Sequence, residues 1–162
     1  MRQRFSDDPG AAARALVAAN RYATLATADA DGVPWASPVW FAPADDLSHV
    51  LWVSAPEARH SRNLAARPEI GVVIFDSTAP PAAAQAFYAS AVAEQVDGDA
   101  VERTLEVYSR RSVAQGLAAW TAAGVTAPAR HRLYRATLRE CFVLGAQDRR
   151  VPVPSLGSSP SG

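Results

Sequence analysis

The sequence contains no lysine, one cysteine and no net charge. Its 16 basic residues other than histidine are all arginines, and 16 acidic residues balance them. Without lysine, neither a P-loop phosphate site nor a Schiff base can form. The balanced charge argues against a general nucleic-acid or anionic-membrane surface, because such surfaces need a clustered basic excess. Any phosphate must therefore be bound by arginine, histidine, hydroxyl groups or backbone amides.

Cysteine and long apolar runs are equally scarce. Cys141 has no second cysteine to pair with, which is typical of a reducing compartment, and its neighbours in ECFVLG indicate a packed core thiol. The first ten residues lack the apolar stretch of a secretory signal, and no run approaches the ~20 apolar residues that span a bilayer. We therefore expect a cytoplasmic protein with no membrane and no nucleic-acid partner.

What the sequence does contain is enough apolar material for one core. Of 162 residues, 49% are hydrophobic, which suits a single domain of this length. We expect that domain over residues 1–150. The last segment, VPVPSLGSSPSG, is rich in proline, serine and glycine, so residues 151–162 are predicted to be a flexible C-terminal tail.

The first half of the chain alternates short strand patterns with turns. Caps at Ser6, Asp7 or Asp8 and a proline at position 9 predict a helix that ends near Asn20. Alternating patterns around Asp31-Gly32 predict a hairpin, and SHVLWVS predicts a third strand. These strands are expected at 21–28, 33–42 and 48–54. A short helix should begin at Pro56-Glu57 and stop at Arg67-Pro68.

The second half continues this pattern. EIGVVIFD is continuously apolar, which predicts a strand buried on both faces, and QAFYASAVAEQV predicts another strand. Residues 97–99 should cap a helix through AVERTLEVYSRR, followed by a less regular helical segment and one or two final strands in HRLYRATLRECFVLG. The order of elements predicts a small antiparallel barrel with helices packed on it, a mainly β fold of the α+β class.

The stretch SAPEARHSRNLAARP concentrates basic residues in one short helix. Arg59 and His60 fall in its first turn, where cations oppose the helix dipole by a few tenths of a kcal/mol each. A bound anion reverses this effect, and the free N–H groups of a helix N-terminus attract anions. Ser54, at the end of the preceding strand, adds a hydroxyl. On these residues alone, an anion site and a solvated basic helix face are both open.

Other candidate residues are less distinctive. The aromatic residues of WASPVWF, Trp35, Trp40 and Phe41, are either barrel core or walls for a flat cofactor. Pro38 marks an edge strand or a local interruption. No metal-ligand spacing, catalytic triad or pair of carboxylates within one element is visible, and we assign no catalytic residue. The chemistry should therefore come from a cofactor.

Taken together, RYATLATADADGVPWASPVWFA, VLWVSAPEARHSRNLAARPEIGVVIFD and AQAFYAS resemble the pyridoxamine 5′-phosphate oxidase-like flavoproteins. The resemblance covers about residues 20–95 and rests on the joint order and spacing of these segments. It implies a six-stranded antiparallel split β-barrel with flanking helices. It also implies a homodimer with FMN bound at the subunit interface, and it favours the anion site over the solvated helix face.

The resemblance also implies a set of cofactor-binding residues. The strand that lines the flavin matches Ser37, Pro38, Val39 and Trp40, and the strand end beside the ribityl phosphate matches Val53 and Ser54. The basic pair that binds the phosphate matches Arg59 and His60, with histidine standing where lysine is usual. Gln85 matches a glutamine at the isoalloxazine edge, although a lone glutamine is usually a surface residue.

The family resemblance implies an FMN-dependent oxidoreductase that exchanges hydride between flavin N5 and a small substrate. Ala42 stands where the oxidase has a lysine for the substrate's phosphate, which argues against true pyridoxamine 5′-phosphate oxidation.

Two other functions stay open. One is a deazaflavin-dependent reductase, with Arg62 and Arg67 along the cofactor tail. The other is a non-catalytic flavin- or haem-binding module, for which His49 and His131 are the unassigned imidazoles. Contributions from the partner chain are assigned to two residues of the C-terminal region, Trp120 and Arg135.

Overall fold

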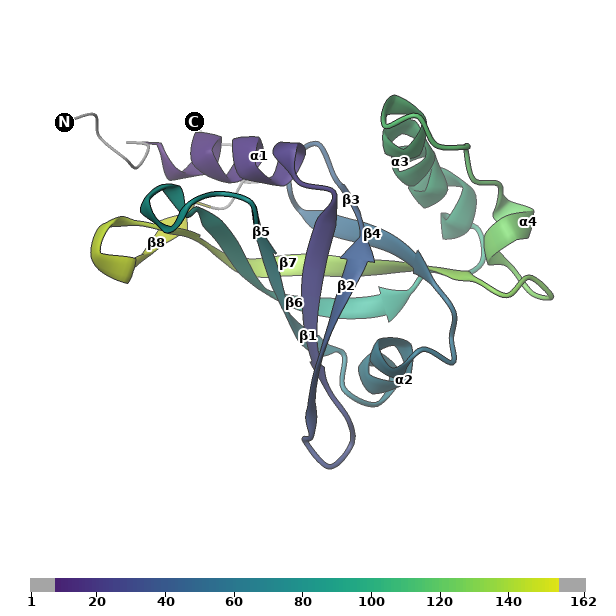
Figure 1. Cartoon of the computed structure of the whole chain (residues 1–162). Coiled ribbons are helices and arrows are strands. Elements are labelled where there is room, and N and C mark those ends of the chain that lie inside the picture. The colour runs from purple at the N-terminus through teal and green to yellow at the C-terminus, as the bar shows by residue number, and fades with distance from the viewer. Residues whose placement is uncertain (1–7, 155–162) are drawn as a thin grey trace, which may run out of the picture.

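A computed structural model describes residues 8–154 of the chain. Its strands form one antiparallel sheet in the order β2-β1-β5-β6-β7-β4-β3, and β8 pairs with β7. The sheet curls into a half-open barrel (Figure 1). The six long strands are β1 (Tyr22–Ala28), β2 (Pro34–Trp40), β4 (His49–Ser54), β5 (Glu69–Phe75), β6 (Ala86–Gln95) and β7 (Arg132–Leu144), and the two short ones are β3 (Ala42–Pro43) and β8 (Arg150–Val153). The mainly β split barrel is confirmed, with β3 and β8 added to the six expected strands.

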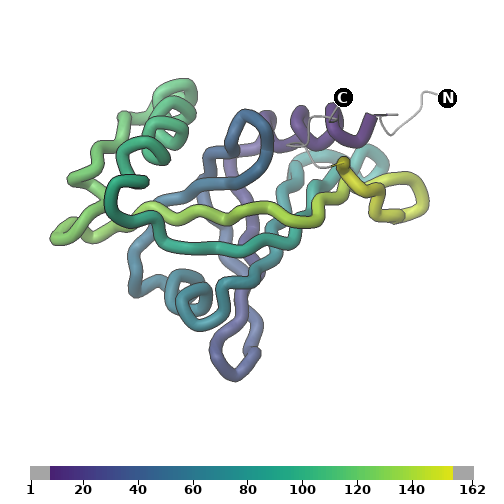
Figure 2. The backbone as a smooth tube through the Cα atoms, turned by 180° about the vertical axis from the view of Figure 1, so that it is seen from behind, coloured from purple at the N-terminus to yellow at the C-terminus, as the bar shows by residue number. Residues whose placement is uncertain are grey.

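The helices cover the ends and one side of the sheet. They are α1 (Pro9–Ala19), α2 (Arg59–Ala66), α3 (Ala100–Ala114) and α4 (Ala122–Val125), with single 3-10 turns at Pro81–Ala83 and Ala146–Asp148. Figure 1 shows α1 across one end of the sheet, α2 at the opposite end beside the β1–β2 hairpin, and α3 with α4 on one side. Seen from behind, β6 and β7 run side by side along the molecule (Figure 2). No helix among residues 8–154 is long and apolar enough to cross a membrane.

The local signals read from the first half of the sequence are confirmed. The Asp8 carboxylate accepts a hydrogen bond of 3.0 Å from the Ala11 N–H, so Asp8 is the N-cap of α1. In the hairpin, Gly32 has a φ of +86°, a conformation that suits glycine. Pro38 lies in β2, which is an edge strand of the sheet, as its missing N–H predicts.

Two elements differ from their predictions. Helix α2 begins at Arg59, because Pro56 and Glu57 lie in a turn closed by a bond of 3.1 Å from the Ala58 N–H to the Ala55 carbonyl. Strand β5 buries one face instead of two. Its residues alternate between buried and accessible, and Phe75 remains 48% exposed, because the strand's outer face is not packed against the core.

The C-terminal region is more regular than expected. Helix α3 continues to Ala114, and β7 is a single strand of 13 residues. Residues 151–153, expected to begin a flexible tail, belong to β8, and Val153 is buried in the core. The rest of the expected tail from residue 155, and two of the three candidate caps, Ser6 and Asp7, lie outside the described residues.

The sheet encloses one main core and borders a second. The main core lies inside the barrel and includes the fully buried side chains of Leu25, Trp52, Ile74 and Phe87. The second cluster lies between α3 and the β3–β4 side of the sheet. Cys141 is half-buried against the main core, and burial raises the pKa of its thiol, as expected for a packed cysteine.

Leu25→Ala should lower the free energy of unfolding by about 2–5 kcal/mol, because Leu25 is fully buried and the substitution leaves a cavity. Urea denaturation measures this loss. The matched control is Leu117→Ala, at a leucine that is 52% exposed, where the change should stay within about 0.5 kcal/mol. Equal losses in the two variants would contradict the assignment of the core.

Candidate functional site

Helix α2 is fixed across the end of the barrel by a buried polar pair. The Asn63 side-chain amide donates a hydrogen bond of 2.9 Å to the Thr27 hydroxyl oxygen, and the Thr27 hydroxyl donates to the Trp35 carbonyl at 3.3 Å. Asn63 and Thr27 are each only 4% exposed. Leu64 packs into the main core beside them. Because both polar groups are satisfied and buried, they set the position of α2 relative to the β1–β2 hairpin.

The positive end of the helix dipole at the N-terminus of α2 is not compensated by a cap or an acidic side chain. The first intrahelical bond, 3.0 Å long, runs from the Arg62 N–H to the Ala58 carbonyl, so the N–H groups of residues 59–61 have no acceptor within the helix. Ala58 supplies no side-chain cap, and the first turn contains no acidic residue. This arrangement suits a bound anion.

Ser54 and His60 meet at this helix end. The Ser54 hydroxyl and His60 Nε2 lie 2.8 Å apart and share a hydrogen bond whose donor depends on the imidazole tautomer. Burial lowers the pKa of His60, so its imidazole is mainly neutral at pH 7. An anion bound beside it would favour the protonated form.

Arg59 turns toward β2. Its guanidinium carbon lies 4.4 Å from the centre of the Trp35 ring, within the range of a cation–π contact. Arg59 is exposed, and it forms no ion pair with any acidic residue between positions 8 and 154. Its N–H donors are therefore free for a ligand, and the Trp35 ring stacks against the guanidinium.

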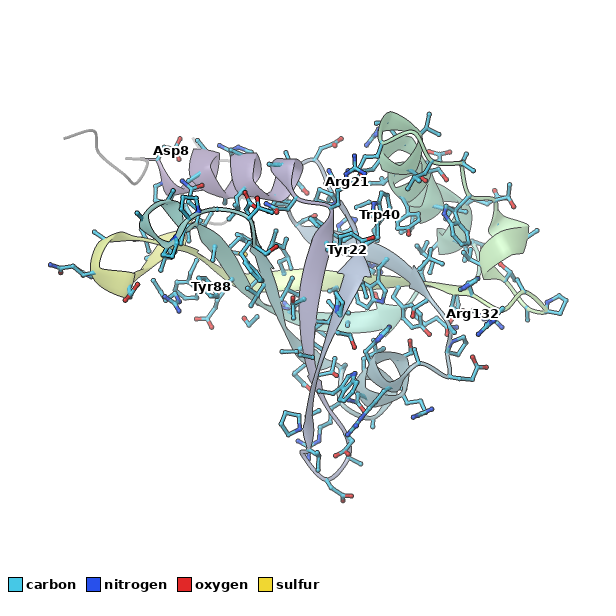
Figure 3. All side chains as sticks on the ribbon, viewed as in Figure 1. Asp8, Arg21, Tyr22, Trp40, Tyr88 and Arg132 are labelled. Atoms are coloured by element: carbon cyan, nitrogen blue, oxygen red, sulfur yellow. The ribbon has the colours of Figure 1, made fainter. Side chains whose placement is uncertain are left out.

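The four residues of β2 that match a flavin-lining strand do not form one surface. Ser37 and Val39 are buried, Val39 within the main core, whereas Pro38 is exposed on the opposite face. Trp40 lies between β2 and α3 (Figure 3), where its Nε1–H donates a bond of 2.9 Å to the Gln115 side chain. Strand alternation therefore divides these residues between the barrel interior, the outer face and the contact with α3.

Val53 contacts α3 as well. Its backbone hydrogen-bonds to the Tyr108 hydroxyl, while burial raises the pKa of Tyr108 to about 12. The Tyr108 ring packs edge-on against Trp40, with 5.0 Å between ring centres. Helix α3 therefore holds both Val53 and Trp40.

Gln85 lies away from this site. It is exposed beside α1, where it lines a pocket with Pro9 and Leu16. Strand β6 starts next to Gln85, and Ala93, nearer its other end, lines a pocket with α2 residues. Ala93 lies eight positions after Gln85, roughly 26 Å of extended strand. One chain does not bring Gln85 together with Arg59 and His60.

The other arginines of the basic stretch are engaged with backbone carbonyls. Arg62 Nη1 donates to the Glu57 carbonyl at 2.6 Å, and Arg67 Nη2 donates to the Ala30 carbonyl at 2.8 Å. The second bond tethers the end of α2 to the turn of the β1–β2 hairpin. Both arginines thus donate to backbone carbonyls, whereas the Arg59 guanidinium stacks on the Trp35 ring.

The remaining candidates are dispersed. His49 Nδ1 lies 2.9 Å from the Ser48 hydroxyl, and His131 packs edge-on against Trp120. Arg135 forms an ion pair with Glu94 at 2.5 Å. Within the described part of the chain, no three histidine, cysteine, aspartate or glutamate residues cluster as metal ligands would.

Sequence reasoning missed two contacts that shape the site. One feature of the sequence could have indicated the Asn63–Thr27 bond: Asn63 is a polar amide next to Leu64, on the buried side of the short helix. The Arg59–Trp35 contact had none, because it depends on how α2 lies across β2. These contacts assign Trp35 and Asn63 to the site.

The chain matches the protein family described as pyridoxamine 5′-phosphate oxidase over residues 10–144. A search of curated proteins found none that matches. Many solved structures share the fold. A haem-binding protein from Mycobacterium smegmatis has a TM-score of 0.70 and 21% identity, covering 91% of this chain and 58% of that one. The haem storage protein HutZ from Vibrio cholerae has a TM-score of 0.61 and 22% identity, covering 80% of this chain and 90% of that one. An FAD-binding protein from Mesorhizobium loti has a TM-score of 0.58 and 19% identity, covering 80% of this chain and 87% of that one.

The free energy of unfolding should fall as pH drops from 7 to 5, and His60→Gln should remove part of this fall. Below pH 6.5 the unfolded chain protonates His60, whereas burial lowers the pKa of folded His60, so the unfolded state binds more protons. His49, whose pKa burial also lowers, accounts for the remainder. Urea denaturation at pH 7, 6 and 5 measures both slopes. An unchanged slope in His60→Gln would show that its imidazole is not desolvated.

Proposed function

The chain belongs to the pyridoxamine 5′-phosphate oxidase family, and we propose that it binds FMN and acts as an oxidoreductase on a small substrate. The observation that carries this proposal is the free, positive N-terminus of α2, where Arg59 and the Ser54–His60 pair have no acidic partner among residues 8–154. The N–H, guanidinium and hydroxyl groups there are the donors that a phosphate accepts. FMN, when bound, supplies hydride exchange at N5.

Each residue has a distinct role in this proposal. Arg59 would bind the phosphate through its guanidinium, which the Trp35 ring keeps in place. Ser54 would donate its hydroxyl to the phosphate once His60 had taken up a proton. The chain's part is to bind and orient the cofactor, and we assign no side chain as acid or base. In this proposal the protein works in the cytoplasm, in keeping with its single cysteine.

The environment of position 42 bears on the substrate. Ala42 is fully buried in the cluster beneath α3, so this position presents no charge to a ligand. A substrate with its own phosphate would have no partner there. We therefore propose a substrate other than pyridoxamine 5′-phosphate.

The engaged arginines favour FMN over a deazaflavin with a longer tail. A basic groove for such a tail would need Arg62 and Arg67, and both already donate to backbone carbonyls. FMN has no such tail, so its binding needs only the phosphate site at the start of α2. The absorption spectrum of the purified protein distinguishes the two, because a flavin has two bands and a deazaflavin one band near the violet.

The outer face of the sheet supports a homodimer. A row of cross-strand partners crosses it through Pro38, Thr24, Val73, Tyr88 and Phe142. The side chains of the row are uncharged, with the Arg150 guanidinium 4.0 Å from the centre of the Tyr88 ring at one end. Tyr22 and Phe75 at its side are 60% and 48% exposed. An apolar face of this extent is typical of an interface. In the dimer that we propose, Gln85 of one chain would contact the isoalloxazine of a flavin, and the other chain would bind the phosphate of that same flavin.

A haem-binding module is the second candidate. Two of the solved structures that share the fold, with TM-scores of 0.70 and 0.61, are described as haem proteins. His49 and His131 are the imidazoles outside the phosphate site, and both already contact neighbouring side chains. A Soret band in place of flavin bands would favour this candidate over the oxidoreductase.

Arg59→Ala should weaken FMN binding roughly ten- to a hundredfold, because a hydrogen bond between charged groups is lost. Riboflavin, which lacks the phosphate, should bind the variant and the parent alike. Fluorescence quenching measures both affinities. The control is Arg67→Ala, which changes an arginine of the same stretch that is tethered to the hairpin. If Arg67→Ala weakens FMN equally, or riboflavin binding falls in step, the basic stretch is only a charged helix face.

Val73→Arg should convert the dimer into a monomer and release the flavin, because it places a charge in the middle of the apolar row. Analytical ultracentrifugation with absorbance detection follows mass and flavin together. Val113→Arg, at a valine on α3 that is 57% exposed, is the matched control and should change neither. A stable monomer that keeps its flavin would refute the shared site.

A further inference from the structure

A groove lies between the second half of α1 and the loop that joins β5 to β6. Its volume is about 410 Å³, a size at which proteins bind small molecules. Leu16 and several alanines form most of its wall, and its polar members are Asn20, Asp76 and Gln85. Helix α1 crosses one end of the sheet and α2 lies at the opposite end (Figure 1). The groove is therefore separate from the phosphate site.

Asp76 is the one charged residue among the described residues that line the groove. Its carboxylate forms no ion pair with a basic residue between positions 8 and 154. The Thr78 N–H and hydroxyl donate to Asp76 Oδ1 at 2.8 and 2.6 Å, and these bonds lower the pKa of Asp76, so it is ionised at pH 7. Both bonds reach the same oxygen. The second oxygen, Oδ2, accepts from no described residue and is available to a ligand.

The C-terminal end of α1 adds a second acceptor to the groove. Asn20 is the C-cap of α1, and its side-chain N–H donates to the Leu16 carbonyl at 2.8 Å. Its side-chain oxygen accepts no hydrogen bond from the described part of the chain, so it can accept one from a ligand. The last turn of α1 contains no basic residue. A cation is favoured at such a helix end, which carries partial negative charge.

One arginine reaches this end of α1 from α3. Arg111 donates to the Asn20 carbonyl at 2.7 Å, and its guanidinium carbon lies 5.2 Å from the centre of the Phe41 ring. This contact compensates part of the helix dipole. Arg111 is not among the residues that line the groove, and the pKa of Asp76 is lowered by Thr78 and Ala79 rather than by a neighbouring cation. The charge of the groove wall is therefore negative.

We propose that this groove binds a small protonated amine, whose ammonium group donates to the Asp76 carboxylate and to the Asn20 side-chain oxygen. An ammonium group has three N–H donors and no acceptor, which matches two acceptors. Leu16 and the alanines contact the apolar body of the amine. A carboxylate ligand would meet the charge of Asp76 and no arginine of the groove wall. The Gln85 amide is left to the isoalloxazine contact proposed above, so the amine site requires neither FMN nor the dimer.

The test uses three six-membered ring compounds that differ in their polar group. Cyclohexylamine, which is protonated at pH 7, cyclohexanol and cyclohexanecarboxylate are titrated into the full chain. The amide signals of residues 15–20 and 76–85 are followed by ¹H–¹⁵N NMR. Cyclohexylamine should bind saturably and roughly two- to fivefold more tightly than cyclohexanol, because an ion pair at an exposed carboxylate contributes modestly in water. Cyclohexanecarboxylate should bind most weakly of the three.

Asp76→Asn removes the charge but keeps an oxygen that can accept the Thr78 bonds, so the loop should retain its structure. In this variant cyclohexylamine should bind no more tightly than cyclohexanol. Asp31→Asn, at an exposed aspartate of the β1–β2 hairpin, is the matched control and should leave the preference for the amine unchanged.

Two results would overturn the proposal: equal binding of the amine and the alcohol to the parent chain, or a preference for the amine that persists in Asp76→Asn. The FMN titration of Arg59→Ala concerns the opposite end of the sheet. Because amine binding needs no flavin, either proposal can fail without the other.

Discussion

The buried hydrogen bond between Asn63 and Thr27 is the constraint on which the rest of the site depends. It ties α2 to β1, and through the Trp35 carbonyl it ties both to β2. A buried amide that lost its partner would be costly, so the helix has little freedom to rotate or slide. Once α2 is fixed there, the positions of its first two residues follow. Arg59 lies over a ring of β2, and His60 lies against the end of β4.

The same constraint explains how the protein tolerates cations at the start of a helix. No acid in the part of the chain that the structure describes neutralises either residue. The π face of Trp35 supports the Arg59 charge, and desolvation keeps His60 mainly neutral. Both arrangements leave donors directed at the same helix end. The positive potential of the dipole therefore remains available to an anion, whereas an acidic residue in the first turn would have cancelled it.

Sequence reasoning succeeded where the physical cause is local. Asp8 with Pro9 marks the start of α1, and Gly32 marks the hairpin turn. It failed where the cause is tertiary: an apolar run cannot show that the outer face of β5 is uncovered, or that Val153 enters the core through β8. The candidate site divides in the same way. Helix chemistry and family resemblance pointed to residues 54, 59 and 60, but the roles of Trp35 and Asn63 depend on how a helix crosses a sheet.

The way α2 is held limits how the site can respond to a bound anion. Asn63 and Leu64 are both buried, so an anion cannot displace the helix without breaking the bond to Thr27 or exposing core surface. Movement of α2 is thus a poor means of response. The remaining route is electrostatic: an anion at the helix N-terminus favours protonation of His60, and the protonated ring then donates from Nε2 to the Ser54 hydroxyl. The helix end can therefore gain charge without moving.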